Sequence, residues 1–122
     1  MIMRSLSNDP RAIRQRERLK SDPLFSHRRK LRTQLNYYYK RKSDSPTSFT
    51  SIVGCTSSEL RTHLESKFLD GMTWDNRKMW DIDHIVPVST SEVDTIEKIN
   101  ELNHYSNLQV LWKIDNIKKG NR

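Results

Sequence analysis

Cysteine, glycine and long apolar runs are scarce in this chain, and these shortages exclude several classes of protein. Cys55 is the only cysteine among 122 residues, which excludes an intramolecular disulfide and a zinc site built from paired cysteines. No segment approaches the roughly 18 uninterrupted apolar residues of a membrane span, and the first residues lack the apolar stretch of a signal peptide. We therefore expect an intracellular, cytoplasmic protein without a membrane partner, in which Cys55 is a small buried residue.

Acidic residues are fewer than basic residues, and the difference is confined to the N-terminal third of the chain. The chain has 22 Lys and Arg against 15 Asp and Glu, which gives a formal net charge of +7. Residues 1–42 hold 13 basic and 3 acidic side chains, a net of +10, whereas residues 43–122 hold 9 and 12, a net of −3. The N-terminal third is therefore expected to meet a polyanionic partner.

The composition changes at residues 43–51, which are rich in the turn-forming residues Ser, Thr, Asp and Pro. A chain of 122 residues has room for one domain with a modest apolar core. We therefore expect a basic helical arm over residues 1–42, a linker over residues 43–51 and a folded domain over residues 52–122.

The arm is predicted to contain two helices. Asp9-Pro10 and Ser21-Asp22-Pro23 both have the form of a helix start, because Asp caps the first turn and Pro fits it. The first helix is predicted over residues 11–20. The second is predicted to reach about Lys42, because an apolar set recurs at helical spacing and a polar set falls on the opposite face. The apolar set is Leu24, Leu31, Leu35 and Tyr38, and the polar set is Arg29, Thr33, Asn36 and Lys40.

The domain is predicted to mix helices with short strands. Thr56 and Glu59 have the spacing of a capping box, which predicts a helix over residues 57–69. Strands are predicted at 72–74, 80–86 and 108–112, a short helix over 92–100 capped within residues 89–91, and a last helix over 114–119. The order strand, long loop, strand, helix predicts an α+β fold, with Trp74, Trp80 and Trp112 in its core.

Residues 81–87, Asp-Ile-Asp-His-Ile-Val-Pro, place a carboxylate beside an imidazole. A neutral imidazole titrates near ~6.5, which suits His84 to take a proton from water. Asp83 and Asn116 offer carboxylate and amide oxygens, the hard ligands that suit Mg²⁺ or Mn²⁺ rather than zinc. Asn107 is placed to fix the loop and the tilt of His84 by hydrogen bonding. These residue types are the ones needed to hydrolyse a phosphodiester with one metal ion.

Neighbouring residues of a regular strand point to opposite faces, so Asp83 and His84 can share one phosphate only where the strand ends. Pro87 favours such an end, because it lacks a donor for the strand ladder. In the last predicted helix, Asn116 and Lys119 are three residues apart, which places a phosphate-binding ammonium beside the amide.

The pattern resembles the HNH endonucleases of the ββα-metal (His-Me finger) type, in their His-Asn-Asn form, and especially small phage-borne or freestanding homing-type proteins. The resemblance runs from about Phe25 to Arg122. Asp-His-Ile alone is a weak motif, whereas the ordered set across the chain is specific. That set comprises Gly54-Cys55-Thr56, Glu59-Leu60, His63-Leu64-Glu65, Phe68, Gly71-Met72-Thr73-Trp74-Asp75-Asn76, Trp80-Asp81-Ile82-Asp83-His84-Ile85, His104-Tyr105, Asn107-Leu108-Gln109, Leu111-Trp112 and Asn116.

The resemblance implies a ββα-metal core preceded by an additional helix, and a DNA endonuclease that depends on Mg²⁺ or Mn²⁺. It implies His84 as the catalytic base, Asp83 and Asn116 as metal ligands, Asn107 as their supporting residue, and products with 5′-phosphate and 3′-hydroxyl ends. We expect a phage-encoded monomer or weak dimer that cuts one strand of double-stranded DNA per site. Nucleic-acid contacts are expected from Arg28, Arg29, Arg32, Asn36, Lys40, Arg41, Lys118 and Lys119.

Two positions depart from the family pattern. Val110 stands where a proline is expected before Leu111-Trp112, and residues 77–79 lack the glycine often found before Trp80. Neither is a catalytic position, but both leave the shapes of the flanking loops, and so the choice of substrate, open.

Several residues keep a second interpretation. His104 is equally suited to touch phosphate or to anchor its loop, whereas His63 is expected to be structural. Tyr38 is expected in the core, and Tyr37 or Tyr39 on a sugar or base. A protein that binds nucleic acid without cutting it, and a nuclease directed at RNA, are the alternative functions.

Overall fold

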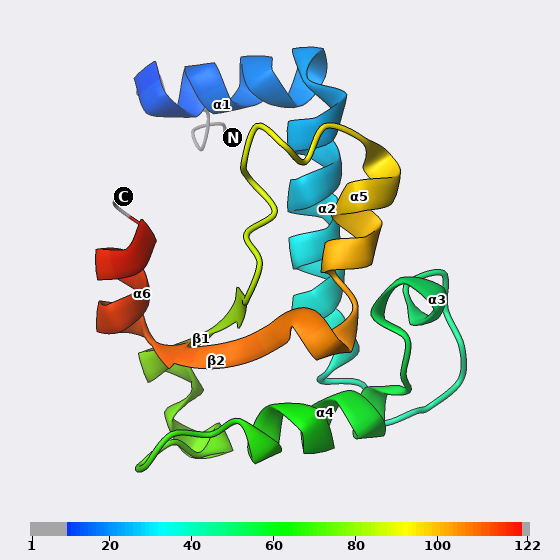
Figure 1. Ribbon diagram of the computed structural model, residues 1–122, viewed down its shortest axis with the longest axis vertical. Coiled ribbons are helices and arrows are strands. Elements are labelled where there is room, and N and C mark those ends of the chain that lie inside the picture. The colour runs from blue at the N-terminus through cyan, green and yellow to red at the C-terminus, as the bar shows by residue number, and fades with distance from the viewer. Residues whose placement is uncertain (1–9, 121–122) are drawn as a thin grey trace, which may run out of the picture.

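The computed structural model describes residues 10–120, except for the side chains of residues 15, 16, 18–21, 119 and 120. Helices and one small sheet form an α+β fold, as predicted from the sequence (Figure 1). The elements in chain order are α1 (Pro10–Ser21), α2 (Pro23–Tyr38), α3 (Thr50–Val53), α4 (Ser57–Ser66), the 3₁₀ helix η1 (Trp74–Met79), β1 (Trp80–His84), α5 (Ile96–Leu102), the 3₁₀ helix η2 (Tyr105–Asn107), β2 (Leu108–Trp112) and α6 (Lys113–Gly120).

The two strands pair in antiparallel register, with Trp80 opposite Trp112 and His84 opposite Leu108. In Figure 1, α6 follows one end of this sheet, α4 runs beneath it, and α2 and α5 lie side by side beyond its other end. The predicted order of strand, long loop, strand and helix is therefore confirmed. None of the described helices is long and apolar enough to cross a membrane.

Helix α2 is built into the core of the protein. It starts as predicted, with Asp22 Oδ1 accepting hydrogen bonds from the backbone N–H groups of the first turn, at 3.1 Å each. Its apolar stripe buries Leu31, Leu35 and Tyr38 in one cluster with residues of α3, α4, β1 and β2. The Tyr38 hydroxyl donates to Cys55 O at 2.7 Å. The second helix of the expected arm therefore has no separate core of its own.

Aromatic rings fill the space between α4, η1 and the sheet, as expected for the tryptophans. Trp80 is completely buried, and its ring centroid lies 5.1 Å from that of Phe68 and 5.5 Å from that of Trp74. The Arg77 guanidinium packs 4.5 Å from the Trp80 ring centroid and donates to Trp80 O at 2.6 Å and to the Tyr39 hydroxyl at 2.8 Å. Such a stacked and hydrogen-bonded guanidinium ties η1 to β1 and to the end of α2.

For α2 and α4, the start of the helix was predicted better than its end. The capping box of Thr56 and Glu59 is present and begins α4 at Ser57, but the helix ends at Ser66 instead of residue 69. Helix α2 ends at Tyr38 rather than near Lys42.

Two local predictions were wrong. Residues 72–74 form no strand, because the Thr73 side chain accepts from Asp75 N and caps the 3₁₀ helix η1 instead. Helix α5 begins after Thr95, whose hydroxyl accepts from Lys98 N, and not after residues 89–91. Helix α3 begins at Thr50, near the end of the segment predicted as a linker over residues 43–51.

The predicted burial of Cys55 and of the tyrosines is confirmed in part. Cys55 is half-buried rather than fully buried, and burial together with the nearby Glu59 charge raises the pKa of its thiol to about 11. Tyr38 is in the core, and Tyr39 is buried with it, whereas Tyr37 is exposed.

Replacing Leu35 by Ala should lower the free energy of unfolding by about 2–5 kcal/mol, because the cavity would open inside the shared core. Tyr37→Ala on the exposed side of the same helix should change it by less than about 0.5 kcal/mol. Urea denaturation of the full chain measures both values. Equal, small effects would show that α2 is not part of the folding unit.

Candidate functional site

Strand β1 ends at His84, which is the geometry that the adjacent Asp83 and His84 require. Asp83 lies opposite Gln109 in the sheet, and Gln109 Nε2 donates to Asp83 Oδ2 at 3.1 Å. This bond holds the carboxylate beside β2, while the chain leaves the sheet directly after His84. The carboxylate and the imidazole are thus consecutive in the last two positions of the strand, and of the two only His84 lines the pocket described below.

Asn107 fastens the loop that follows His84. Its side-chain oxygen accepts from Val86 N at 2.9 Å, and its Nδ2 donates to Val86 O at 3.1 Å and to Leu102 O at 2.8 Å. Its backbone carbonyl accepts from Ile85 N at 2.8 Å. One amide therefore joins the loop, the end of α5 and the start of β2, which limits how far His84 can tilt.

Asn103 holds the ring of His84, and the sequence analysis missed it. The Asn103 side chain is 3% exposed, and its Oδ1 lies 2.9 Å from His84 Nε2. Its Nδ2 donates to Ile99 O at 2.8 Å. A backbone carbonyl can only accept, so the amide cannot be reversed, and its oxygen must face the imidazole. His84 therefore donates from Nε2, which places the lone pair of the neutral ring on Nδ1.

No pattern in the sequence marked Asn103. It is the C-cap residue directly after α5, four residues after the buried Ile99, a position that the helical period assigns to an apolar core residue. A buried amide at such a position needs polar partners, but the sequence does not say which ones.

Asn116 reaches the sheet from α6, and it does so at Asp81. Asn116 Nδ2 donates to Asp81 Oδ2 at 3.3 Å, and Lys113 Nζ forms an ion pair with Asp81 Oδ1 at 2.7 Å. Burial alone would raise the pKa of Asp81, but the hydrogen bonds from Lys113 and Asn116, with the charges of Lys113 and Arg32, hold the pKa below its usual value. Asp81 therefore stays ionised and anchors the first turns of α6.

Asp81 and Asp83 are two residues apart in β1 and so project from the same face of the strand. Asn116 contacts Asp81 of this pair, and carboxylate and amide oxygens are hard ligands of the kind that Mg²⁺ and Mn²⁺ prefer. Among the described side chains, no group of three or more His, Cys, Asp and Glu is arranged to hold a metal ion. An ion held through Asp83 and the Asn116 oxygen would take most of its ligands from water and substrate.

A pocket of about 230 Å³ opens beside His84. Its walls come from α2, η1, β1 and the start of α6, and its floor is formed by Leu35 and Ile82. The walls carry three cationic side chains and one carboxylate. The polar residues that line it are Arg32, Asn36, Arg77, Asp81, His84 and Lys113.

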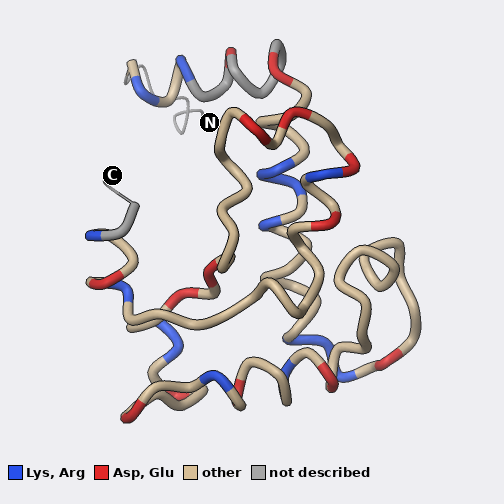
Figure 2. Tube along the Cα trace, viewed as in Figure 1, with Lys and Arg blue, Asp and Glu red and all other residues tan. Residues whose placement is uncertain are grey.

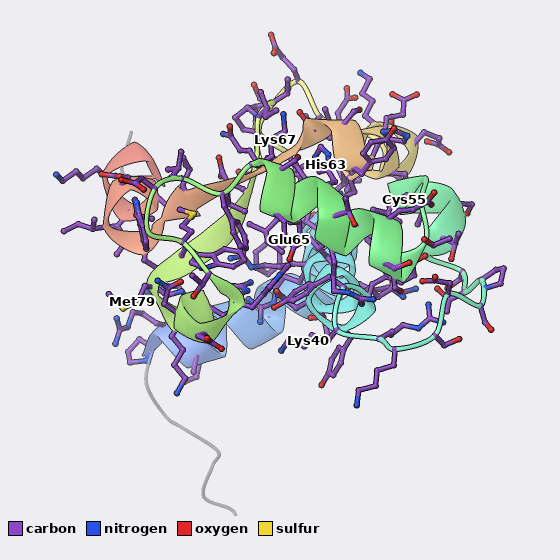
Figure 3. The ribbon with its side chains drawn as sticks, turned by 90° about the horizontal axis from the view of Figure 1, so that it is seen from below. Lys40, Cys55, His63, Glu65, Lys67 and Met79 are labelled. Carbon is purple, nitrogen blue, oxygen red and sulfur yellow. The ribbon has the colours of Figure 1, made fainter. Side chains whose placement is uncertain are left out.

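The predicted nucleic-acid contacts are not all directed at this pocket. Figure 2 shows the basic positions along α1 and α2 and the acidic positions along the loop before α5 and in α5. Arg32 and Asn36 line the pocket, whereas Lys40 lies near the C-terminal end of α2 (Figure 3). Arg41 is occupied by the linker, because it donates to Ser45 O at 2.6 Å. Arg28 is half-buried, Arg29 and Lys118 are exposed, and the Lys119 side chain lies outside the described residues.

The contacts of His104 favour the loop-anchoring interpretation. Its Nδ1 accepts from Ser106 N at 3.2 Å, and its ring covers Gly54. Gly54 has φ +83°, and a Cβ at this position would lie 2.5 Å from His104 Nε2. Only glycine meets both conditions. His63 is structural, as expected, with Nε2 3.1 Å from Leu108 O.

Comparisons with known proteins identify two relatives in Acanthamoeba polyphaga mimivirus, both described as uncharacterized. One is 26% identical over 111 residues, which make up 90% of this chain and 48% of the viral protein. The other is 30% identical over 102 residues, 82% of this chain and 44% of the viral protein. The chain therefore spans about half the length of the curated relatives it matches. No protein-family profile and no solved structure matches it.

Replacing Asn103 by Leu should release His84 from its single tautomer and should lower the free energy of unfolding by about 1–3 kcal/mol, because Ile99 O loses its donor in the core. Nitrogen-15 NMR of the imidazoles measures the tautomer. His63, whose Nε2 also faces a carbonyl, provides an internal reference that should not change. A wild-type His84 protonated at Nδ1 would contradict the assignment.

Proposed function

We propose that this protein is a divalent-metal-dependent DNA endonuclease with a ββα-metal site formed by β1, β2 and α6. The observation that carries the proposal is the end of β1, where His84 is oriented by the buried Asn103 beside Asp83, with Asn116 docked on the same strand from the following helix. Each of these side chains has a distinct chemical role in phosphodiester hydrolysis.

His84 acts as the general base. With its Nε2–H donated to Asn103, the ring takes the proton of the attacking water at Nδ1, and the imidazolium then donates from both nitrogens. Since the acceptor at Nε2 is a neutral amide, Asn103 orients the ring without giving it a fixed negative charge. General base catalysis of this kind contributes roughly 10²- to 10⁴-fold to the rate.

Asp83 and the Asn116 oxygen hold the metal in this proposal. When bound, Mg²⁺ or Mn²⁺ stabilises the negative charge on the phosphate and on the leaving 3′ oxygen. Gln109 keeps Asp83 at the sheet, and Asp81 takes the Asn116 Nδ2, so that the amide oxygen of Asn116 remains available as a ligand. Asp81 thus supports the site without serving as its base.

Double-stranded DNA is the proposed substrate. The chain carries a formal net charge of +7, and its basic side chains on α2 lie on the helix that also lines the pocket beside His84. One such site cuts one strand, so a monomer produces nicks, and a double-strand break requires two sites or two encounters.

His84→Ala should reduce the nicking of supercoiled plasmid in Mg²⁺ by roughly 10²- to 10⁴-fold, because the water loses its base. His27→Ala is the matched control, since it removes an imidazole that bonds Asn100 between α2 and α5 and lies outside the site. Gel densitometry of nicked plasmid over time measures the rates. Comparable cutting by wild type and His84→Ala would refute the base, and undiminished cutting in EDTA would refute the metal.

Asp83→Asn should raise the Mg²⁺ concentration needed for half-maximal cutting by at least about tenfold, because even residues that only support a metal ligand contribute that much. Asp75→Asn on the exposed start of η1 removes the same charge away from β1 and should leave the requirement unchanged. Nicking rates over a range of Mg²⁺ concentrations measure the shift. An unshifted curve for Asp83→Asn would remove Asp83 from the metal site.

Binding and cutting assays with duplex DNA, single-stranded DNA and RNA test the two alternative functions. Specific binding with no cutting in any metal would identify a non-cleaving DNA-binding protein. Preferential cutting of RNA over duplex and single-stranded DNA would identify an RNA-directed nuclease.

A further inference from the structure

We propose that the pocket between α2, η1, β1 and α6 binds one backbone phosphate of the DNA strand, next to the phosphodiester at His84. This inference rests on the proposed function for its choice of DNA as the ligand. It assigns Lys113, which the sequence analysis did not select, and it gives Arg32 a specific partner.

The charges of the pocket suit an anion. Arg77 is already committed to Trp80 O, the Tyr39 hydroxyl and Asn36 Oδ1, so it contributes a fixed positive charge in the wall. Arg32 and Lys113 are the two mobile cations, because both side chains are exposed enough to reorient. They come from α2 and α6, on two sides of the same opening.

In the absence of DNA, the Asp81 carboxylate is the anionic partner of these cations. Its carboxylate accepts the Lys113 ammonium at 2.7 Å and feels the charge of Arg32. The Lys113 side chain is 49% exposed, so exchanging this partner for a phosphate oxygen requires only a rotation of a flexible side chain. The Asp81 side chain is 20% exposed and keeps the Asn116 amide as a partner after the exchange.

The lining of the pocket suits a phosphate and its adjoining sugar rather than a base. A volume of about 230 Å³ corresponds to roughly eight water molecules at about 30 Å³ each, which leaves room for both groups. The floor of Leu35 and Ile82 is apolar and suits the adjoining sugar, and no described Phe, Tyr or Trp side chain lines the pocket for stacking. Because His84 is part of the wall, a phosphate held here places the next phosphodiester of the DNA strand near the His84 imidazole, the proposed general base.

The salt dependence of binding tests the proposal, because its slope counts the phosphates that a protein neutralises, at about 0.9 per phosphate for duplex DNA. Dissociation constants are measured by fluorescence anisotropy with a short DNA duplex, in EDTA, over a series of NaCl concentrations. The double variant Arg32→Gln with Lys113→Gln should reduce the slope by about 0.9, since both cations contact one phosphate. The double control Lys67→Gln with Lys98→Gln removes the same charge outside the pocket and should leave the slope unchanged.

Asp81→Asn should act in the opposite direction. Removing the carboxylate that competes for Lys113 should tighten binding roughly twofold to fivefold, because the pair is solvated on its Lys113 side. Circular dichroism confirms that each variant is folded, and Arg32→Gln alone provides a variant on the exposed side of α2 if the Lys113 change disturbs α6.

Each outcome decides the question. If the double variant keeps the wild-type salt slope, or if the control loses as much, the pocket binds no phosphate. A reduction of about 1.8 would show that Arg32 and Lys113 contact two separate phosphates instead of one. Weaker binding by Asp81→Asn overturns the exchange of partners. Binding is measured without metal and does not depend on cutting. If the double variant loses about 0.9 of the slope but the wild type does not cut plasmid, the phosphate pocket is supported and only the nuclease proposal fails.

Discussion

The buried amide of Asn103 is the interaction on which the candidate site depends. It is held on one side by the Ile99 carbonyl and presents its oxygen to His84 on the other, and this leaves one orientation for the ring. Without it, an imidazole at the end of a two-stranded sheet would be free to rotate into the loop that follows. Asn107 adds a second restraint by tying that loop to α5 and β2. The site is therefore preorganised from α5, an element that contributes no group to the chemistry itself.

Local sequence signals predicted much of the fold. The strand at Leu108–Trp112 and the capped start of α4 were obtained from alternation and from the spacing of Thr56 and Glu59, because both depend on neighbouring residues only. The end of β1 at His84 followed from a geometric requirement and is also observed. The catalytic roles and the family resemblance remain predictions, because the comparisons found only uncharacterized viral proteins.

What sequence reasoning missed depends on contacts between distant parts of the chain. Asn103 and His84 are 19 residues apart, and the bond from Asn116 to Asp81 spans 35 residues, so no local pattern marks either pair. The strand predicted at residues 72–74 does not form. The Thr73 side chain caps a 3₁₀ helix there, although the alternation of apolar residues also suits a strand. The apolar stripe of α2 was predicted from its helical spacing, but the sequence did not show that Leu31 and Leu35 pack into the same core as the strands.

The packing of α2 into the common core has a consequence for how binding energy is used. A cationic segment on a flexible tether would hold DNA while leaving the reacting bond to find the base by diffusion within reach of the tether. Here the helix and the sheet share one hydrophobic core, which includes Leu31, Leu35 and Trp80. In the proposed nuclease, a contact of α2 with the phosphate backbone would therefore also position the bond at His84, without further ordering of the chain before reaction.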